Sequence, residues 1–287
     1  MTSLRPRPPD GTIRAPDGAS IAIFRCGAST GPPIVLVHGA TADHTTWRTS
    51  GPLLGAGHPL IAVDRRGRGA SGDGPPGQPY AIEREFEDLA AVVDAVAAEH
   101  GRPVDVVGHS YGGRVALGAA LRTRNLRRLV SYEGAPPAPE GLGYQDDDAA
   151  IVGRIAGLVA AGDRDEALAT FMREIVAMPD ADLAAFRADP IWARRAAAID
   201  TTLRELGAET SPAASLRTLG AVRQPVLQVL GGASAAPFAA ATVALDALLV
   251  DGRIVTIEGA RHAAHHTHAR EFAAAVDAFL ASLDVAD

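Results

Sequence analysis

A serine lies at the centre of a Gly-x-Ser-x-Gly pattern in residues 108–112, which read Gly-His-Ser-Tyr-Gly. The apolar run 103–107 precedes this pattern, and a helix-like segment, 113–121, follows it. This order predicts a tight turn between a strand and a helix with Ser110 at its apex, the arrangement called a nucleophile elbow. The glycines relieve the crowding that such a turn imposes on its neighbours. A hydroxyl held in this way can attack a carbonyl carbon, so Ser110 is our candidate nucleophile.

Three segments in one order resemble the α/β-hydrolase fold superfamily. An apolar strand over 32–37 leads to His38, the elbow follows at Ser110, and a strand over 253–257 leads to His262 near the C-terminus. The resemblance covers nearly the whole chain. It implies an α/β fold in which a mostly parallel, twisted sheet has helices on both faces and an inserted helical cap.

The resemblance places the catalytic base at His262, where a loop after the last strand can bring an imidazole to Ser110. An imidazole titrates near neutral pH, so it can take the serine proton and return it to the leaving group. His265 and His266 are alternative bases, but they would lie deeper in the helix predicted there. The three histidines would share a helix face at metal-ligand spacing, yet solvated histidines at this spacing usually need no ligand, and we expect no metal.

The acid that would orient His262 stands in an unusual place. In most of the superfamily an Asp follows the penultimate strand, but this chain has Ala233 and Ser234 there. Glu133 follows the preceding strand, and this resembles the arrangement in those haloalkane dehalogenases that carry a Glu in that place. From either strand, a buried carboxylate would fix the imidazole tautomer and stabilise the imidazolium, so we expect Glu133 to be the acid. The alternatives are Glu258, Asp251 and a dyad assisted only by water.

The resemblance also implies an oxyanion hole made of backbone N–H groups. The loop after His38 resembles a His-Gly-X loop, so the amide of Ala40 would join that of Tyr111 in stabilising the developing negative charge. His38 itself would chiefly pin this loop through hydrogen bonds. We expect the substrate pocket to include Trp47, His38 and His109, although Trp47 could equally be ordinary core.

The alternation of short apolar strands and helices predicts the parallel sheet, and it breaks after Glu133. From about residue 149 to residue 219 the apolar pattern is helical only, and the alternation returns at 224–230. In the superfamily, an insertion at this point is a cap that roofs the active site. We therefore predict a core of residues 1–134 and 220–287 and a cap of residues 135–219.

Composition excludes several other classes of protein. The net charge of −7 does not favour a nucleic acid or an anionic membrane as partner. All 27 basic residues are Arg, so Schiff-base and P-loop lysines are excluded. The lone Cys26 cannot form an intramolecular disulfide. We find no signal-like segment and no apolar run of about 18 residues, so we expect no membrane span and a cytoplasmic location.

Residues 67–72 match the dinucleotide pattern Gly-x-Gly-x-x-Gly literally. A Gly- and Pro-rich loop follows them, whereas a dinucleotide site needs a helix N-terminus at that point. We therefore interpret this segment as a structural loop beside the pocket and expect no cofactor.

These features together predict a cofactor-independent serine hydrolase of the esterase or lipase type. It would cleave a carboxylic ester, lactone or thioester of a small- to medium-sized hydrophobic substrate through an acyl-enzyme on Ser110. Dehalogenases and epoxide hydrolases of this fold need an Asp nucleophile, and the serine argues against both. The alternatives are a lyase or C–C bond enzyme with the same triad and a non-hydrolytic binding or biosynthetic auxiliary protein. A Glu133 side chain pointing away from His262 would favour the last.

Overall fold

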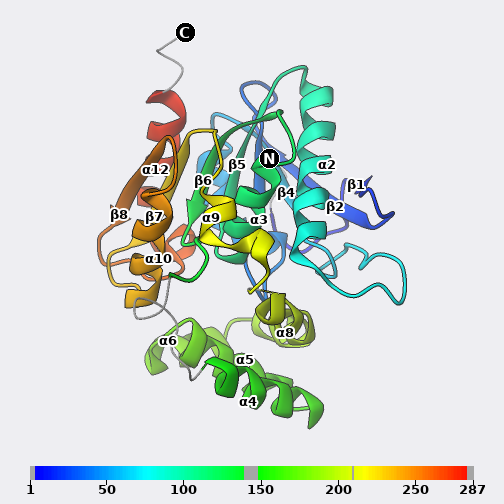
Figure 1. Ribbon diagram of the computed structural model, residues 1–287, viewed down its shortest axis with the longest axis vertical. Helices are drawn as coiled ribbons and strands as arrows, with labels where there is room; N and C mark the ends of the chain where they lie inside the picture. The colour runs from blue at the N-terminus through cyan, green and yellow to red at the C-terminus, as the bar shows by residue number, and fades with distance from the viewer. Residues whose placement is uncertain (1–3, 139–147, 209, 283–287) are drawn as a thin grey trace.

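The computed structural model describes residues 4–138, 148–208 and 210–282, and its core is one sheet of eight strands (Figure 1). The strand order across the sheet is β1-β2-β4-β3-β5-β6-β7-β8. The strands are β1 (Gly11–Arg14), β2 (Ser20–Gly27), β3 (Ile34–Val37), β4 (Pro59–Val63), β5 (Val104–His109), β6 (Leu126–Tyr132), β7 (Val226–Gly231) and β8 (Gly252–Ile257).

Six neighbouring strands of the sheet pair in parallel, in the order β4-β3-β5-β6-β7-β8. The other two strands are antiparallel, since β1 pairs with β2 and β2 pairs with β4 in that way. Parallel strands have their carboxyl ends at the same edge of the sheet. Residues that follow β3, β5, β6 and β7 therefore meet along this edge. His109 at the end of β5 pairs with Tyr132 at the end of β6, which brings Ser110 and Glu133 close together.

Side chains of successive strand residues point to opposite faces of the sheet. In β3, Val35 and Val37 enter one apolar cluster with α2 (Ile82–His100) and α3 (Tyr111–Ala120). Ile34 and Leu36 enter a second cluster with α12 (Ala269–Ser282) on the other face. Both faces are covered, which explains why the parallel strands are nearly continuous apolar runs.

The remaining helices of the core are short, apart from α10. They are η1 (His44–Arg48), α1 (Gly51–Leu54), η3 (Pro212–Ala214), α9 (Leu216–Leu219), α10 (Ala236–Asp246) and α11 (Ala264–Thr267). Ala214 and Leu219 pack in the same cluster as α2 and α3, so η3 and α9 belong to the core by their packing.

A further group of helices lies between β6 and β7 in the chain. These are α4 (Asp148–Ala160), α5 (Arg164–Thr170), the π-helix η2 (Phe171–Ile175), α6 (Asp180–Arg187), α7 (Trp192–Ala197) and α8 (Ile199–Ala208). They share an apolar cluster of their own around Leu168 and Trp192. Figure 1 shows α4, α5, α6 and α8 as a layer beyond one edge of the sheet.

The mostly parallel sheet with helices on both faces confirms the predicted α/β-hydrolase fold. Residues 139–147, which belong to the predicted cap of residues 135–219, lie outside the described part of the chain. Within the described part of the chain, no helix combines the length and the apolar character that crossing a bilayer requires.

Candidate active site

Ser110 lies between the end of β5 and the start of α3, with φ 53° and ψ −126°. A positive φ is strained for a residue with a side chain, and such strain is typical of functional turns. The turn is fixed by the backbone, since Ser110 N–H donates to the Tyr132 carbonyl at 2.7 Å. A Cβ on Gly108 would approach the Gly112 carbonyl oxygen to 2.6 Å, so the turn requires glycine there.

Glu133 stands directly after β6, and its carboxylate is completely buried. Its Oε2 accepts a hydrogen bond from His262 Nδ1–H at 2.5 Å, and its Oε1 accepts one from the Gly231 N–H at 2.7 Å. Gly231 is the last residue of β7, so this carboxylate occupies the end of the strand where the superfamily usually has its Asp. The two bonds hold the carboxylate in one orientation toward the imidazole.

His262 lies in the segment between β8 and α11, and three groups fix its position. Besides the bond to Glu133, its carbonyl oxygen accepts a hydrogen bond from His109 Nε2–H at 2.7 Å. Phe238 of α10 stacks on the imidazole, with ring centroids 4.3 Å apart and planes at 21°. Because Nδ1 is bonded to Glu133, Nε2 is the ring nitrogen left to exchange a proton with a hydroxyl.

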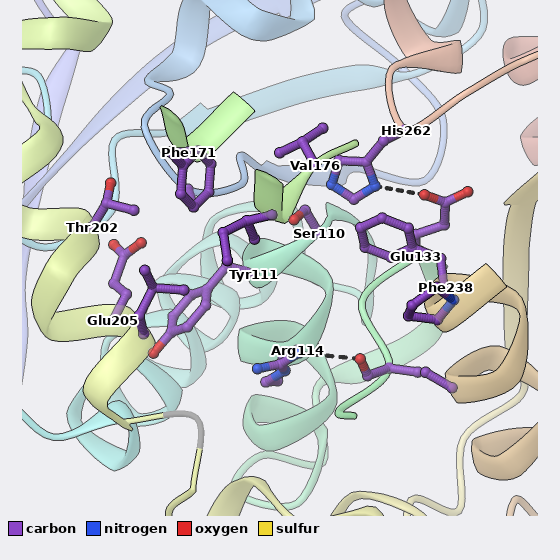
Figure 2. Close-up of a pocket in the computed structure, with 16 residues that line it drawn as sticks. Ser110, Tyr111, Arg114, Glu133, Phe171, Val176, Thr202, Glu205, Phe238 and His262 are labelled. Atoms are coloured by element: carbon purple, nitrogen blue, oxygen red, sulfur yellow. Dashed lines mark hydrogen bonds and ion pairs between the residues drawn. The ribbon is translucent and has the colours of Figure 1, made fainter. Parts of the chain in front are cut away.

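The three predicted triad residues line one cavity, which encloses about 550 Å³ of empty space including the part open to solvent. Figure 2 shows the Ser110 side chain beside the His262 imidazole, with Glu133 on the far side of that ring. Ala40 and Tyr111, the predicted oxyanion residues, line the same cavity. The helices η2 and α8 add further side chains to the lining, namely Phe171, Ile175, Thr202, Glu205 and Leu206.

The three residues expected in the substrate pocket do not line this cavity. Trp47 is fully buried and packs against His265. It belongs to the apolar cluster that includes α12 on one face of the sheet, so it is a core residue. His38 is also fully buried, where Nδ1–H donates to the Gly39 carbonyl at 2.8 Å and Nε2 accepts from the Arg65 N–H at 2.9 Å. Both rings are therefore used inside the fold, and the cavity lining gives no support to the substrate-pocket role expected for Trp47 and His38.

His109 is the third of these residues. It does not line the cavity, but it helps to position His262 by donating a hydrogen bond to the His262 carbonyl oxygen. Burial lowers the pKa of His109 well below its usual value, and the neighbouring His265 and His262 act in the same direction. Its ring is therefore neutral at neutral pH and can donate through Nε2–H without carrying charge.

The alternative bases and acids lie away from the cavity. Burial is the main reason why the pKa of His265 is well below its usual value. The ring of His265 contacts the Thr46 hydroxyl at 3.1 Å. His266 contacts the Thr49 hydroxyl at 2.8 Å. Glu258 is exposed on the turn after β8. None of these side chains lines the cavity that holds Ser110.

Asp43, His44 and Asp64 are buried and close enough together to raise the question of a metal site. Asp64 Oδ1 accepts from the His44 N–H at 2.8 Å and from His44 Nδ1–H at 2.9 Å, and Oδ2 accepts from the Ala70 N–H at 2.8 Å. Asp43 pairs with Arg194 at 2.5 Å. Hydrogen-bond donors thus already use the carboxylate oxygens that a cation would need, and the cluster fits a structural role.

Sequence reasoning missed two features of the site. Phe238 stacks on the base, and Glu205 places a buried carboxylate in the cavity wall. In α8, Ile199, Thr202 and Glu205 follow one another at intervals of three residues and are all buried. Polar residues on the apolar face of a helix were the available signal, since such groups are rarely buried without a partner.

The comparisons with known proteins agree with this architecture. A family model described as the alpha/beta hydrolase family matches residues 34–275. The chain is 32% identical over 249 residues to a pimeloyl-[acyl-carrier protein] methyl ester esterase of Neisseria meningitidis, covering 84% of this chain and 90% of that protein.

Two solved structures extend the likeness. An alpha/beta hydrolase from Sphaerobacter thermophilus has 33% identity and a TM-score of 0.72, over 86% of this chain and 92% of that one. A hydrolase from Pseudomonas aeruginosa has 27% identity and a TM-score of 0.74, over 94% and 97%. On the family match, the curated relative and the fold, this chain belongs to the alpha/beta hydrolase family.

Proposed function

We propose that this protein is a serine hydrolase that cleaves a carboxylic ester, lactone or thioester of a small- to medium-sized substrate. The observation that carries the proposal is the 2.5 Å bond between Glu133 and His262 in the cavity that Ser110 also lines. A binding protein on this fold would not need a buried carboxylate aimed at that imidazole. The relative from Neisseria meningitidis, an esterase by name, supports the same reaction class.

The reaction begins when Ser110 Oγ attacks the substrate carbonyl and His262 Nε2 accepts the hydroxyl proton. The Glu133 carboxylate stabilises the imidazolium that forms. The imidazolium then protonates the leaving alcohol or thiol, which leaves an acyl-enzyme on Ser110. A water that gives its proton to His262 attacks this ester, and the carboxylic acid and free Ser110 are released.

The negative charge on the attacked oxygen needs donors that are in place before the reaction. The backbone N–H groups of Ala40 and Tyr111 are proposed for this role, because both residues line the cavity. Tyr111 is also the first residue of α3, where the helix dipole favours negative charge. Loss of one such donor typically slows the reaction by about 100- to 1,000-fold.

The helices α4 to α8, which share their own apolar cluster, are proposed to act as the cap within the predicted insertion of residues 135–219. Phe171, Ile175 and Leu206 are apolar residues that line the same cavity as Ser110, and they would help to exclude bulk water from the acyl-enzyme.

The proposal is tested by steady-state hydrolysis of p-nitrophenyl esters, thioesters and lactones of increasing chain length. We expect turnover of short and medium acyl chains, and a fall to the background rate in Ser110→Ala and His262→Ala. A matched control is His268→Ala, because His268 does not line the cavity. Turnover that survives in folded Ser110→Ala would contradict the proposal.

A further inference from the structure

The cavity has a second polar end, away from the triad. Glu205 and Thr202 of α8 line it, and Figure 2 shows both on the opposite side of the lining from His262 and Glu133. Phe171 stands between the two ends in the same view. A substrate bound at Ser110 would thus reach Glu205 past an apolar stretch of wall.

Glu205 is 1% exposed, and its two carboxylate oxygens have different surroundings. Oε1 is paired with Arg65 Nη2 and with Arg68 Nη2, the latter at 2.7 Å. Oε2 is buried and has no hydrogen-bond partner in the part of the chain that the structure describes. A buried carboxylate oxygen without a donor lowers the stability of the fold, because burial has removed its hydrogen bonds to water and no protein group has replaced them.

Thr202 adds a donor beside this acceptor. Its Oγ1 accepts from Arg68 Nη2 at 3.0 Å, so its own hydroxyl hydrogen points elsewhere. Thr202 and Glu205 are three residues apart on α8 and share one face. Together they offer one acceptor and one donor, which is the pattern that an alcohol hydroxyl satisfies, since it donates one bond and accepts others.

The charges around Glu205 favour a neutral ligand group over an ion. Arg65 and Arg68 balance Glu205 and Glu85, the second carboxylate paired with Arg65 at 2.9 Å. Arg114 also lines the cavity and would repel an ammonium group. A carboxylate on the substrate would be repelled by Glu205 Oε2.

We propose that Glu205 Oε2 and the Thr202 hydroxyl bind a hydroxyl group of the substrate, at the end of the cavity remote from the scissile carbonyl. This inference rests on the proposed hydrolysis and specifies its substrate class as hydroxylated esters, lactones or thioesters. An apolar chain would connect the two functional groups, because Phe171 stands between the two ends and the apolar Ile175 and Leu206 also line the cavity.

The test compares three series of straight-chain p-nitrophenyl esters that end in a hydroxyl, a methoxy or a methyl group. A methoxy group accepts hydrogen bonds but cannot donate to Glu205. At the chain length that spans the cavity, we expect kcat/KM for the hydroxyl ester to exceed the other two by about tenfold or more, as for a bond to a charged acceptor. Equal values at every chain length would overturn the proposal.

Glu205→Gln supplies the matched variant. Because Arg65 and Arg68 would hold the remaining amide oxygen, the amide NH₂ would take the place of Oε2, and hydroxyl and methoxy esters should then react at similar rates. Glu174→Gln is the control, since Glu174 is exposed on η2 and pairs with Arg154 instead. A hydroxyl preference that is unchanged in folded Glu205→Gln would also overturn the proposal.

Binding to Ser110→Ala gives a readout that does not need catalysis. Calorimetric titration should give tighter binding for ω-hydroxy amides than for the corresponding alkyl amides, again by about tenfold. If no ester is hydrolysed, the proposed function fails, while this titration still decides the subsite. If Glu205→Gln does not fold, the comparison in the unaltered chain and Thr202→Val decide it, and Thr202→Val should weaken binding of the hydroxy amide selectively.

Discussion

At the scale of single residues, the position of Glu133 explains how His262 gains a carboxylate partner. Its backbone has φ 45°, and the Gly231 N–H holds its second oxygen. These two constraints let a carboxylate that follows β6 lie at the end of β7. Ala233 and Ser234, where the superfamily usually carries its acid, can therefore lack a carboxylate without loss of the Nδ1 bond to His262.

Glu133→Gln is expected to lower kcat by about 1,000- to 10,000-fold, because the amide cannot hold the imidazole in the required tautomer or stabilise its charge. The folded state should persist, since Gln can still accept the Gly231 N–H. The measurement is kcat on the best ester together with thermal unfolding. Glu258→Gln is the matched control on the surface, and unchanged activity in Glu133→Gln would remove Glu133 from the triad.

Cys26 gives an independent check on how the chain is packed. Burial raises the pKa of its thiol to about 11, so almost no thiolate is present at neutral pH. We expect iodoacetamide to modify the native protein slowly and to leave ester hydrolysis unchanged. Rapid modification is expected after unfolding in guanidinium. Fast labelling of the native protein would show that Cys26 lies closer to solvent than the structure has it.

The residue types and their order predicted Ser110, His262 and Glu133, and the structure brings the three to one cavity. Local patterns carry that information, because a turn, a strand end and a loop each place one side chain. Trp47 was open to two interpretations, since an aromatic ring near a loop fits a pocket or a core equally well. Its position under the sheet depends on α12, a helix more than two hundred residues later in the chain, and no local pattern records such a contact.

At the scale of elements, the elbow depends on close contact between a strand and a helix. A methyl group on Gly108 would meet both the Gly112 carbonyl oxygen and the Gly113 Cα at 2.6 Å. Gly108→Ala is therefore expected to destabilise the fold by about 3 kcal/mol and to abolish activity. Gly157→Ala is the control, because nothing lies within 4 Å of that position on α4 and alanine favours helix by about 0.5–1 kcal/mol. Urea unfolding of the two variants measures the contrast, and similar stabilities would contradict it.

Asp43 connects two elements, since it caps η1 and pairs with Arg194 of α7. Burial opposes its ionisation, but hydrogen bonds from Thr45 and Arg194 prevail and lower the pKa of the carboxyl below its usual value. A lowered folded pKa gives stability that is present above the unfolded pKa, near 4, and is lost as pH falls below it.

Asp43→Asn keeps a good helix cap and removes the charge. We expect it to be less stable than the unaltered chain by about 1 kcal/mol at neutral pH, and we expect the difference to shrink below about pH 4. Urea unfolding across this range measures it. A difference that is constant with pH would mean that the carboxyl pKa is not lowered in the folded state.

At the scale of the whole molecule, ion pairs of two kinds join the helices between β6 and β7 to the core. Arg194 of α7 reaches Asp43 with its side chain 44% exposed. Glu205 of α8 is paired with Arg65 and Arg68 with almost no exposure. Salt screens the first kind far more than the second, because screening requires access of solvent ions.

Hydrogen exchange is therefore expected to respond unevenly to salt. Raising the ionic strength should speed amide exchange more in α7 than in α8, because the buried pairs of Glu205 resist screening although the exposed Arg204–Asp73 pair of α8 does not. Exchange measured by mass spectrometry in low and in high sodium chloride, with β5 as an internal reference, tests this. A response of α8 as large as that of α7 would contradict a buried attachment.

The alternation of strands and helices was sufficient to predict the sheet, because parallel strands covered on both faces need continuous apolar runs such as 34–37 and 104–107. The attachment of α8 could not be predicted in the same way. Glu205 finds its partners at Arg65 and Arg68, about 140 residues earlier in the chain. An isolated carboxylate in a helical pattern indicates solvent exposure until its partners are known.

The central claim is that Ser110 is an activated nucleophile, and intact-mass labelling with a fluorophosphonate tests it most directly. The unaltered chain should gain the mass of one phosphonyl group, and Ser110→Ala should gain none. Labelling should also slow strongly in Glu133→Gln, because the serine proton would no longer be taken up efficiently. A folded protein that gains no adduct, or an adduct that persists in Ser110→Ala, would contradict the account.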